Sequence, residues 1–490
     1  MLLRDDKPKS GILCAVSSLP SKYGIGTFGI ESYKFIDFLA ETGQKYWQML
    51  PLVPLGDENS PYKSSSCYAG EILYIDLHFL VRDGLLKPYD LPDDFCDGEK
   101  VNFDKARELK IPLIEKAAQN FDTDNKDYGI FLEENSDWLN DYAVFMTALE
   151  VYGAYSISEL PKSLRSGNEK AAKEITMAYP DKIKFFKVSQ YFFFAQFFEM
   201  KRYAEDKNIS LIGDLPFYVS LDSSDVWGNP ENFLLDEDIK PKLVAGVPPD
   251  YFSETGQLWG NPIYNFEYQK TTGYSWWIKR LKHYFKLYDV VRIDHFRAFA
   301  NYYTIPFGEE TAMNGEWVEG VGMDFWNKAK KEIPDMNVIA EDLGGEIPLV
   351  QSLVKETGFP NMKIIQFAFS GDPNNGHLPD NYIENCLCYT GTHDNNTALG
   401  FYNNALPHEK EMIDRLYPAS PDMPVPLNLI NGAMKSRAKT VIIPIQDWLM
   451  LDENSRMNVP GVAKGNWNFK LSDDYLTDEL KTRIRKFGRK

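Results

Sequence analysis

The sequence predicts an α/β protein in which eight parallel strands close into a (β/α)₈ barrel, also called a TIM barrel. Eight short apolar runs alternate with segments of helical periodicity, a pattern that favours a parallel sheet. Several of these runs end in an acidic residue, and the carboxyl ends of barrel strands are where active sites lie. The length of 490 residues suits one barrel with insertions or two to three domains. A doubly wound open sheet is the structural alternative.

The eight runs extend from the N-terminal region to the C-terminal region of the chain. In order they are GILCAV (11–16), KYWQML (45–50), ISLIGD (209–214), VVRID (290–294), VIAED (338–342), MKIIQFAF (362–369), CLCYTGTHD (386–394) and VIIPIQD (441–447). Helical patterns precede two of them, at 273–288 and 324–333.

The spacing of the runs predicts the domain organisation. Residues 1–60 and 205–490 are expected to form the barrel, and 61–204 a mainly helical insertion, because that span reads as amphipathic helices. The phenylalanine-rich segment 188–206 is interpreted as a core helix that packs on the barrel. Residues 219–275 have little periodicity and are expected to form a loop-rich excursion that caps the cleft.

Composition excludes several classes of partner. The net charge is −18, whereas nucleic acids, anionic membranes and polyanionic substrates require basic surfaces. Aromatic residues make up 14% of the chain, enough for some of them to line a pocket. A small or neutral ligand is therefore expected.

Cysteine usage and the chain ends indicate a compartment. The five cysteines are scattered and fit reduced thiols in a cytoplasm. Cys386 and Cys388 have no second Cys/His pair at ligand spacing, so no metal is expected there. The N-terminus has no apolar signal core, and no apolar run has the length of a membrane span. We expect a cytoplasmic protein.

Charged residues gather at the ends of the fourth, fifth and seventh runs. Arg292 and Asp294 are two apart on a strand and share a face, so we expect Arg292 to lower the pKa of Asp294. Glu341 has apolar and acidic neighbours, which raise a carboxyl pKa. Asp394, next to His393, adds a third carboxylate.

This pairing favours retaining glycoside chemistry, in which a nucleophile and a general acid stand about 5–5.5 Å apart. Two alternatives stay open. An aspartate after a strand is often only a turn former or helix cap, and metal hydrolases also gather acids at barrel mouths.

The glycine pattern GIGTFG (24–29) matches a dinucleotide motif, but other residues separate it from its strand, and the second run lacks the ribose-binding acid. A tight loop at the barrel mouth explains those glycines better.

Longer motifs make the sequence similar to one family. They run nearly end to end: SSLPSKYGIGTFG (17–29), WQMLPLVP (47–54), SPYKSSSCYAG (60–70), IGDLPFYV (212–219), GVPPDYFSETGQLWGNPIY (246–264), RIDHFR (292–297), IAEDLG (339–344), GTHDNNT (391–397), RMNVPG (456–461) and GNWNFK (465–470). The sequence resembles the 4-alpha-glucanotransferases, also called amylomaltases or disproportionating enzymes, of the alpha-amylase-like glycoside hydrolase superfamily. The resemblance implies a barrel with a helical insertion.

The resemblance also implies roles for individual residues. Asp294 matches the family nucleophile, Glu341 the acid/base, and Asp394 the carboxylate that stabilises the transition state. The substrate-binding residues implied by the same motifs are Tyr62, Asp214, Gln257, Trp259, Arg292, His393 and Asn466. The chain departs from the family at Glu71, where asparagine is usual, and in LMLDENSRMN (449–458), which is looser than usual.

The implied reaction is retaining transfer of α-1,4-glucan segments from a donor to the 4-hydroxyl of glucose or a maltooligosaccharide. Maltooligosaccharides, starch or glycogen fragments, and glucose are the expected partners, with no cofactor, no metal, no nucleic acid and no membrane. The expected assembly is a monomer or a weak homodimer. An amylase-like hydrolase and a non-catalytic glucan-binding protein are the alternative functions.

Overall fold

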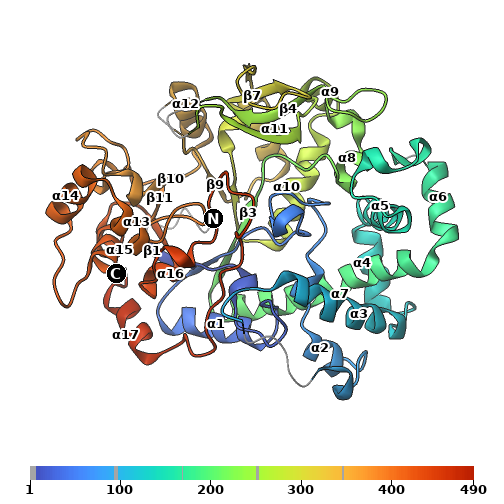
Figure 1. Ribbon diagram of the computed structural model, residues 1–490, viewed down its shortest axis with the longest axis horizontal. Coiled ribbons are helices and arrows are strands. Elements are labelled where there is room, and N and C mark those ends of the chain that lie inside the picture. The colour runs from blue at the N-terminus through green and yellow to red at the C-terminus, as the bar shows by residue number, and fades with distance from the viewer. Residues whose placement is uncertain (1–6, 93–97, 168, 250–252, 345–346, 490) are drawn as a thin grey trace.

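Eight parallel strands form a closed barrel (Figure 1). The computed structural model describes residues 7–92, 98–167, 169–249, 253–344 and 347–489. Around the barrel the order is β1-β2-β3-β6-β9-β10-β11-β12, and β12 closes on β1. This confirms the predicted fold, because each predicted run supplies one strand. The strands are β1 (Lys9–Leu13), β2 (Tyr46–Gln48), β3 (Ser210–Leu215), β6 (Val290–Ile293), β9 (Val338–Ala340), β10 (Asn361–Ile364), β11 (Cys386–Tyr389) and β12 (Thr440–Pro444).

Helices connect the barrel strands and follow the last one. Between strands these are α1 (Ile30–Glu41), α10 (Ser275–Leu287), α11 (Gly322–Glu332), α12 (Pro348–Thr357), α13 (Ala398–Asn404), α14 (Pro407–Leu416) and α15 (Val425–Lys435), and after β12 come α16 (Ile445–Trp448) and α17 (Asp478–Lys486). Helix α10 shows why they pack inward. Trp277, Leu281 and Tyr284 recur about one turn apart, all three are buried, and the helix contacts β3 and β6.

A group of helices separates β2 from β3 and lies to one side of the barrel (Figure 1). It comprises α2 (Leu77–Arg82), α3 (Phe103–Asn120), α4 (Lys126–Glu134), α5 (Leu139–Tyr152), α6 (Glu169–Ala178) and α7 (Pro180–Asp206). Helix α7 is the predicted phenylalanine-rich core helix. It contacts α1 and β3, and its Phe193 ring packs edge-on against Phe28 at a centroid distance of 5.1 Å.

A second, antiparallel sheet lies outside the barrel, in the order β5-β4-β7-β8 (Figure 1). Its strands are β4 (Leu243–Val247), β5 (Gln257–Pro262), β7 (Asn301–Pro306) and β8 (Glu316–Glu319). The short helix α8 (Ser224–Gly228) comes before β4, and the short helix α9 (Phe266–Thr271) comes after β5. Sequence patterns predict no strands here. Strand β5 contains Gly260 and Pro262, residue types that are depleted in strands, and β4 pairs with β7, which lies far along the chain.

Candidate active site

An arginine links two acids where β3 and β6 run side by side. Asp214 of β3 is paired in register with Arg292 of β6. The Arg292 Nη1 donates to both carboxylate oxygens of Asp214 at 2.7 Å, and its Nη2 donates to Asp294 Oδ1 at 3.0 Å. Arg292 and Asp214 are buried, whereas 28% of the Asp294 side chain is exposed. The arginine therefore fixes Asp294 while leaving part of it open to solvent.

Arg292 acts to lower the pKa of Asp294, as predicted, but the expected net lowering is wrong. Burial raises the pKa of the Asp294 carboxyl to about 6, and the opposing effect of Arg292 does not cancel this rise. Burial is the largest cause of the raised pKa, and the guanidinium of Arg292 also binds the Asp214 carboxylate. The negative charges of Asp214 and Asp394 disfavour ionisation further.

Glu341 comes directly after β9 and lies beside Asp294. Ile293 pairs with Ala340 across β6 and β9, so the next residues, Asp294 and Glu341, leave adjacent strands together. The Glu341 carboxylate accepts hydrogen bonds from the backbone N–H of His295 at 2.7 Å and of Leu343 at 2.9 Å. Burial, followed by the charge of Asp294, raises the pKa of Glu341 to about 7 against the pull of Arg292. The direction of this shift is the predicted one.

His295 has a strained backbone that serves this arrangement. Its φ of 51° lies in the left-handed region, which is uncommon for a residue other than glycine. In this conformation its N–H reaches the Glu341 carboxylate, and the next N–H, of Phe296, donates to the Glu341 carbonyl at 3.0 Å. Strain held by surrounding contacts is typical of functional sites.

The strongly acidic carboxyl of the site is Asp394. Burial would raise its pKa, but the neighbouring His393 and the amide of Asn458 hold the pKa of Asp394 well below its usual range. Asn458 Nδ2 donates to Asp394 Oδ1 at 2.6 Å, and His393 Nε2 lies 3.3 Å from Asp394 Oδ2. The same charge raises the pKa of His393, although burial opposes this. Asp394 is therefore the acid that stays ionised.

Tyr62 connects the arginine pair to the histidine. Its hydroxyl donates to Asp214 Oδ2 at 2.8 Å and lies 2.8 Å from His393 Nε2, so its oxygen accepts from that ring. The Tyr62 and His393 rings are stacked at 5.4 Å with an interplanar angle of 16°. A continuous chain of contacts thus joins Asp294 to Asp394.

The remaining predicted substrate-binding residues, Gln257, Trp259 and Asn466, lie around this network of contacts. Gln257 and Trp259 share a face of β5, the Trp259 indole N–H donates to Gln257 Oε1 at 3.1 Å, and the Trp259 ring meets His295 edge-on at 4.9 Å. Asn466 accepts from the Val459 N–H at 3.0 Å and donates to the Val462 carbonyl at 2.7 Å, so its amide holds its own loop. Whether these residues bind substrate stays a prediction.

Sequence reasoning missed four residues that contact the site: His295, Arg456, Asn458 and Trp467. Arg456 Nη2 donates to the Asp394 carbonyl at 2.9 Å, and the Trp467 ring lies 5.6 Å from that of Tyr62. Arg456 and Asn458 belong to the quoted motif RMNVPG and Trp467 to GNWNFK. The motifs were therefore a usable signal, although nothing in them says which residues face the acids.

The other singled-out residues have local explanations. A Cβ at Gly26 of the GIGTFG segment would lie 1.9 Å from the Val16 carbonyl oxygen, so close packing of the chain on itself requires this glycine.

Burial raises the pKa of the Cys386 and Cys388 thiols to about 12, and in the described part of the chain no three His, Cys, Asp or Glu residues are grouped to hold a metal ion. Within the described ranges, no helix combines the length and apolar character needed to cross a membrane.

Glu71, the departure from the family pattern, is a buried structural acid. Its carboxylate accepts from the Leu55 N–H at 2.8 Å and from the Leu73 N–H at 2.9 Å. These bonds join the segment after β2 to a 3₁₀ turn at 72–74. The substitution therefore affects loop architecture next to the segment that carries Tyr62.

A parallel eight-stranded barrel with paired carboxylates at the carboxyl ends of its strands is typical of enzymes that act on glycosidic bonds. The chain belongs to the 4-alpha-glucanotransferase family, glycoside hydrolase family 77, whose model matches residues 14–477. It is an enzyme of that class, a transferase.

Two relatives and one solved structure extend this result along the chain. The 4-alpha-glucanotransferase of Clostridium butyricum is 42% identical over 479 residues, covering 97% of this chain and 98% of the relative. That of Streptococcus pneumoniae is 43% identical over 477 residues, covering 96% and 94%. The amylomaltase from Streptococcus agalactiae, solved in complex with acarbose, superposes with a TM-score of 0.95 at 38% identity, covering 98% of each chain.

Proposed function

We propose that this enzyme moves α-1,4-glucan segments with retention, through a covalent glycosyl ester on Asp294. In the first displacement Glu341 donates its proton to the glycosidic oxygen, the Asp294 carboxylate bonds to the anomeric carbon, and the C–O bond breaks. The shortened glucan leaves with the proton. In the second, the Glu341 carboxylate removes the proton of the acceptor 4-hydroxyl, whose oxygen displaces Asp294.

The observation that carries this proposal is the register of β6 and β9. Because Ile293 and Ala340 are paired on adjacent parallel strands, Asp294 and Glu341 leave the barrel next to each other. Their pKa values also suit the two roles. Glu341, at about 7, keeps a proton in neutral solution more readily than Asp294, at about 6. The nucleophile is thus mostly ionised under conditions in which much of the acid is still protonated.

Asp394 is proposed to bind hydroxyl groups of the distorted sugar. It stays ionised because His393 and Asn458 stabilise its charge, and 39% of its side chain is exposed and able to contact a ligand. A carboxylate that binds the distorted sugar more tightly than the relaxed one lowers the barrier, because only differential binding accelerates the reaction.

The proposed donors are maltooligosaccharides and fragments of starch or glycogen, and glucose or a maltooligosaccharide is the acceptor. The family and the acarbose complex of the similar amylomaltase support an oligosaccharide ligand. The negative net charge of −18 suits uncharged sugars.

The products formed from maltotriose test the proposed transfer. We expect glucose and maltopentaose, because the maltosyl group released from one trisaccharide joins a second one. The products are separated by chromatography at early times, and added glucose should lower the yield of maltopentaose, because transfer of the maltosyl group to glucose regenerates maltotriose. Glucose and maltose without any longer product would instead identify an amylase-like hydrolase, and unchanged maltotriose a glucan-binding protein.

The pH dependence of kcat/KM should be bell-shaped, with an acid limb near 6 and an alkaline limb near 7. Asp294 must be ionised to attack, so activity falls as pH drops through its raised pKa of about 6. Glu341 must be protonated to donate, so activity falls as pH rises through about 7. Initial rates of glucose release from maltotriose across the pH range measure both limbs, which belong to the coupled pair.

A glycosyl fluoride donor provides the control for this profile. Fluoride leaves without needing a proton, so the alkaline limb of the first displacement should disappear when that step is followed alone. An acid limb near the ordinary aspartate pKa of about 3.9 would contradict the raised value for Asp294.

A further inference from the structure

We propose that Arg456 and Asn458 are positioning residues that hold Asp394 in its working orientation. Segment 456–458, the clamp segment, follows β12 and donates hydrogen bonds to the His393–Asp394 dipeptide, which follows the neighbouring strand β11. This inference rests on the proposed function of Asp394. It adds a set of orienting contacts that Asp294 and Glu341, which directly follow strands, do not require.

Asp394 needs such contacts because the barrel does not orient it. Asp294 and Glu341 directly follow β6 and β9, so the strands fix their backbones. Strand β11 ends at Tyr389, and Asp394 lies five residues later in a segment that is neither strand nor helix. Its carboxylate must therefore be aimed by contacts from elsewhere in the chain.

The clamp segment supplies three hydrogen bonds to two consecutive residues. The Asn458 backbone N–H donates to the His393 carbonyl at 3.0 Å, and its side-chain Nδ2 donates to Asp394 Oδ1 at 2.6 Å. Arg456 Nη2 donates to the Asp394 carbonyl at 2.9 Å. Asp394 is thus bound at its backbone carbonyl and at its carboxylate, which restricts the rotation of its side chain.

The clamp segment is itself anchored. Met457, between the two positioning residues, is buried, and its carbonyl accepts from the Trp467 N–H at 2.7 Å. The Trp467 ring in turn lies 6.1 Å from the His393 ring. Asn466 accepts from the Val459 N–H just beyond the segment. The predicted role of Asn466 in substrate binding is thereby joined by a structural one.

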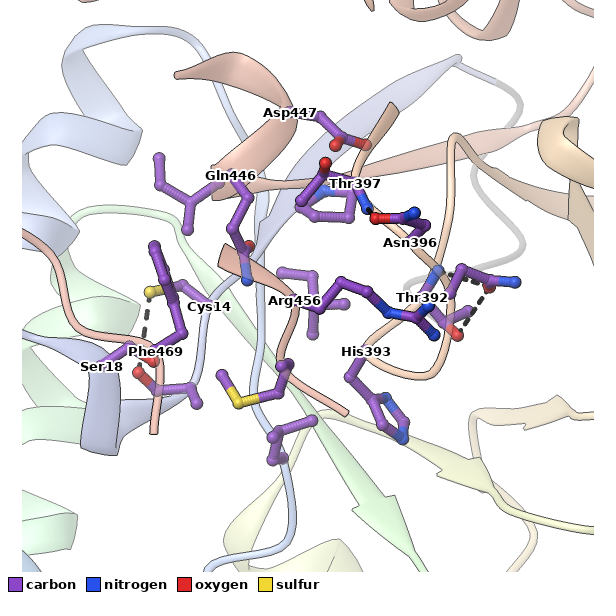
Figure 2. A pocket seen from close by; sticks show the side chains of 17 residues that line it. Cys14, Ser18, Thr392, His393, Asn396, Thr397, Gln446, Asp447, Arg456 and Phe469 are labelled. Atoms are coloured by element: carbon purple, nitrogen blue, oxygen red, sulfur yellow. Dashed lines mark hydrogen bonds between the residues drawn. The ribbon is translucent and has the colours of Figure 1, made fainter. Parts of the chain in front are cut away.

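Figure 2 shows Arg456 in a small cavity that His393 also lines. The Arg456 side chain runs across it and ends beside Thr392 and His393. The cavity has a volume of about 20 Å³ and is lined by both Arg456 and His393. Arg456 and His393 thus line the same cavity, next to the residue that Arg456 is proposed to position.

Substitution of Asn458 tests the proposal. In Asn458→Ala we expect kcat for maltotriose transfer to fall by about 10²-fold, a typical loss when a catalytic group is misplaced by about 1 Å, while KM changes by less than a few-fold. Arg456→Met keeps the apolar stem and loses the bond to the Asp394 carbonyl, and should also lower kcat rather than raise KM. Should Asn458→Ala not fold, Asn458→Asp keeps the shape but has no amide donor.

Asn454→Ala is the matched control. Asn454 lies close by in the chain, is exposed, and its side chain donates to Asp452. Its kcat and KM should equal those of the unaltered enzyme. Thermal unfolding midpoints of all variants separate a loss of fold from a loss of rate.

A double-mutant cycle separates this inference from the proposed function. If Asn458 acts through Asp394, the variant Asp394→Ala/Asn458→Ala should be no slower than Asp394→Ala alone. Losses that multiply would overturn the clamp and leave the role of Asp394 intact. Near-normal activity of Asp394→Ala itself would overturn the proposed role of Asp394.

Discussion

Replacing Asp294 by asparagine should abolish transfer, lowering kcat by about 10⁴-fold or more, because the covalent ester can no longer form. The fold should persist. Arg292 Nη1 remains bound to both oxygens of Asp214, so the variant leaves no unpaired buried guanidinium. Initial rates with maltotriose measure the loss, and calorimetric titration with a maltooligosaccharide should show that binding is retained. Transfer close to normal would refute Asp294 as the nucleophile.

A smaller side chain at this position gives a sharper test of stereochemistry. In Asp294→Ala, azide has room to attack the anomeric carbon of an α-maltosyl fluoride directly, with one inversion. The expected product is the β-glycosyl azide. An α-azide would mean that another group still forms a covalent intermediate.

Replacing Glu341 by glutamine should lower kcat for maltotriose by about 10²–10⁴-fold, the usual contribution of general acid–base catalysis. The amide has the shape of the acid, but its single oxygen replaces the two that accept from the His295 and Leu343 N–H groups, so one of these bonds is lost and the thermal unfolding midpoint of the variant is measured beside its activity. With an α-maltosyl fluoride the first displacement needs no proton, and the glycosyl-enzyme should accumulate. Mass spectrometry of the intact protein detects the added sugar.

Azide and a neighbouring acid control this second experiment. Azide needs no base, so it should release the accumulated sugar from Glu341→Gln as the α-glycosyl azide, opposite to the product of Asp294→Ala. Asp342→Asn is the matched variant, because Asp342 accepts from the Asn361 side chain and the Met362 N–H. Asp342→Asn should keep most of its activity. A comparable loss of activity in Asp342→Asn would contradict the assignment of Glu341 as the acid/base.

The strands and the acids of the site could be predicted from sequence because both are local signals. Each barrel strand is a short apolar run, and Asp294 and Glu341 stand directly after their strands. What could not be predicted depends on contacts between distant segments. The pairing of β4 with β7, and the bonds from Asn458 to a dipeptide more than sixty residues earlier, leave no periodic trace.

The raised pKa of Asp294 was missed for the same physical reason. Sequence places Arg292 two residues away and so suggests a stabilised charge. It does not reveal that Asp214, from another strand, binds the same guanidinium, or how deeply the site is buried. Electrostatics at a site depend on all of its neighbours, whereas spacing along the chain identifies one.

The sharing of Arg292 between Asp214 and Asp294 bears on the lifetime of the proposed glycosyl-enzyme. Two carboxylates around one guanidinium carry an excess negative charge, and esterification of Asp294 removes that excess, leaving Arg292 and Asp214 as a neutral couple. Breakdown of the ester must restore the unbalanced state, which slows it. This cost applies equally to attack by an acceptor sugar and by water, so a preference for chain exchange has to come from contacts that hold the acceptor.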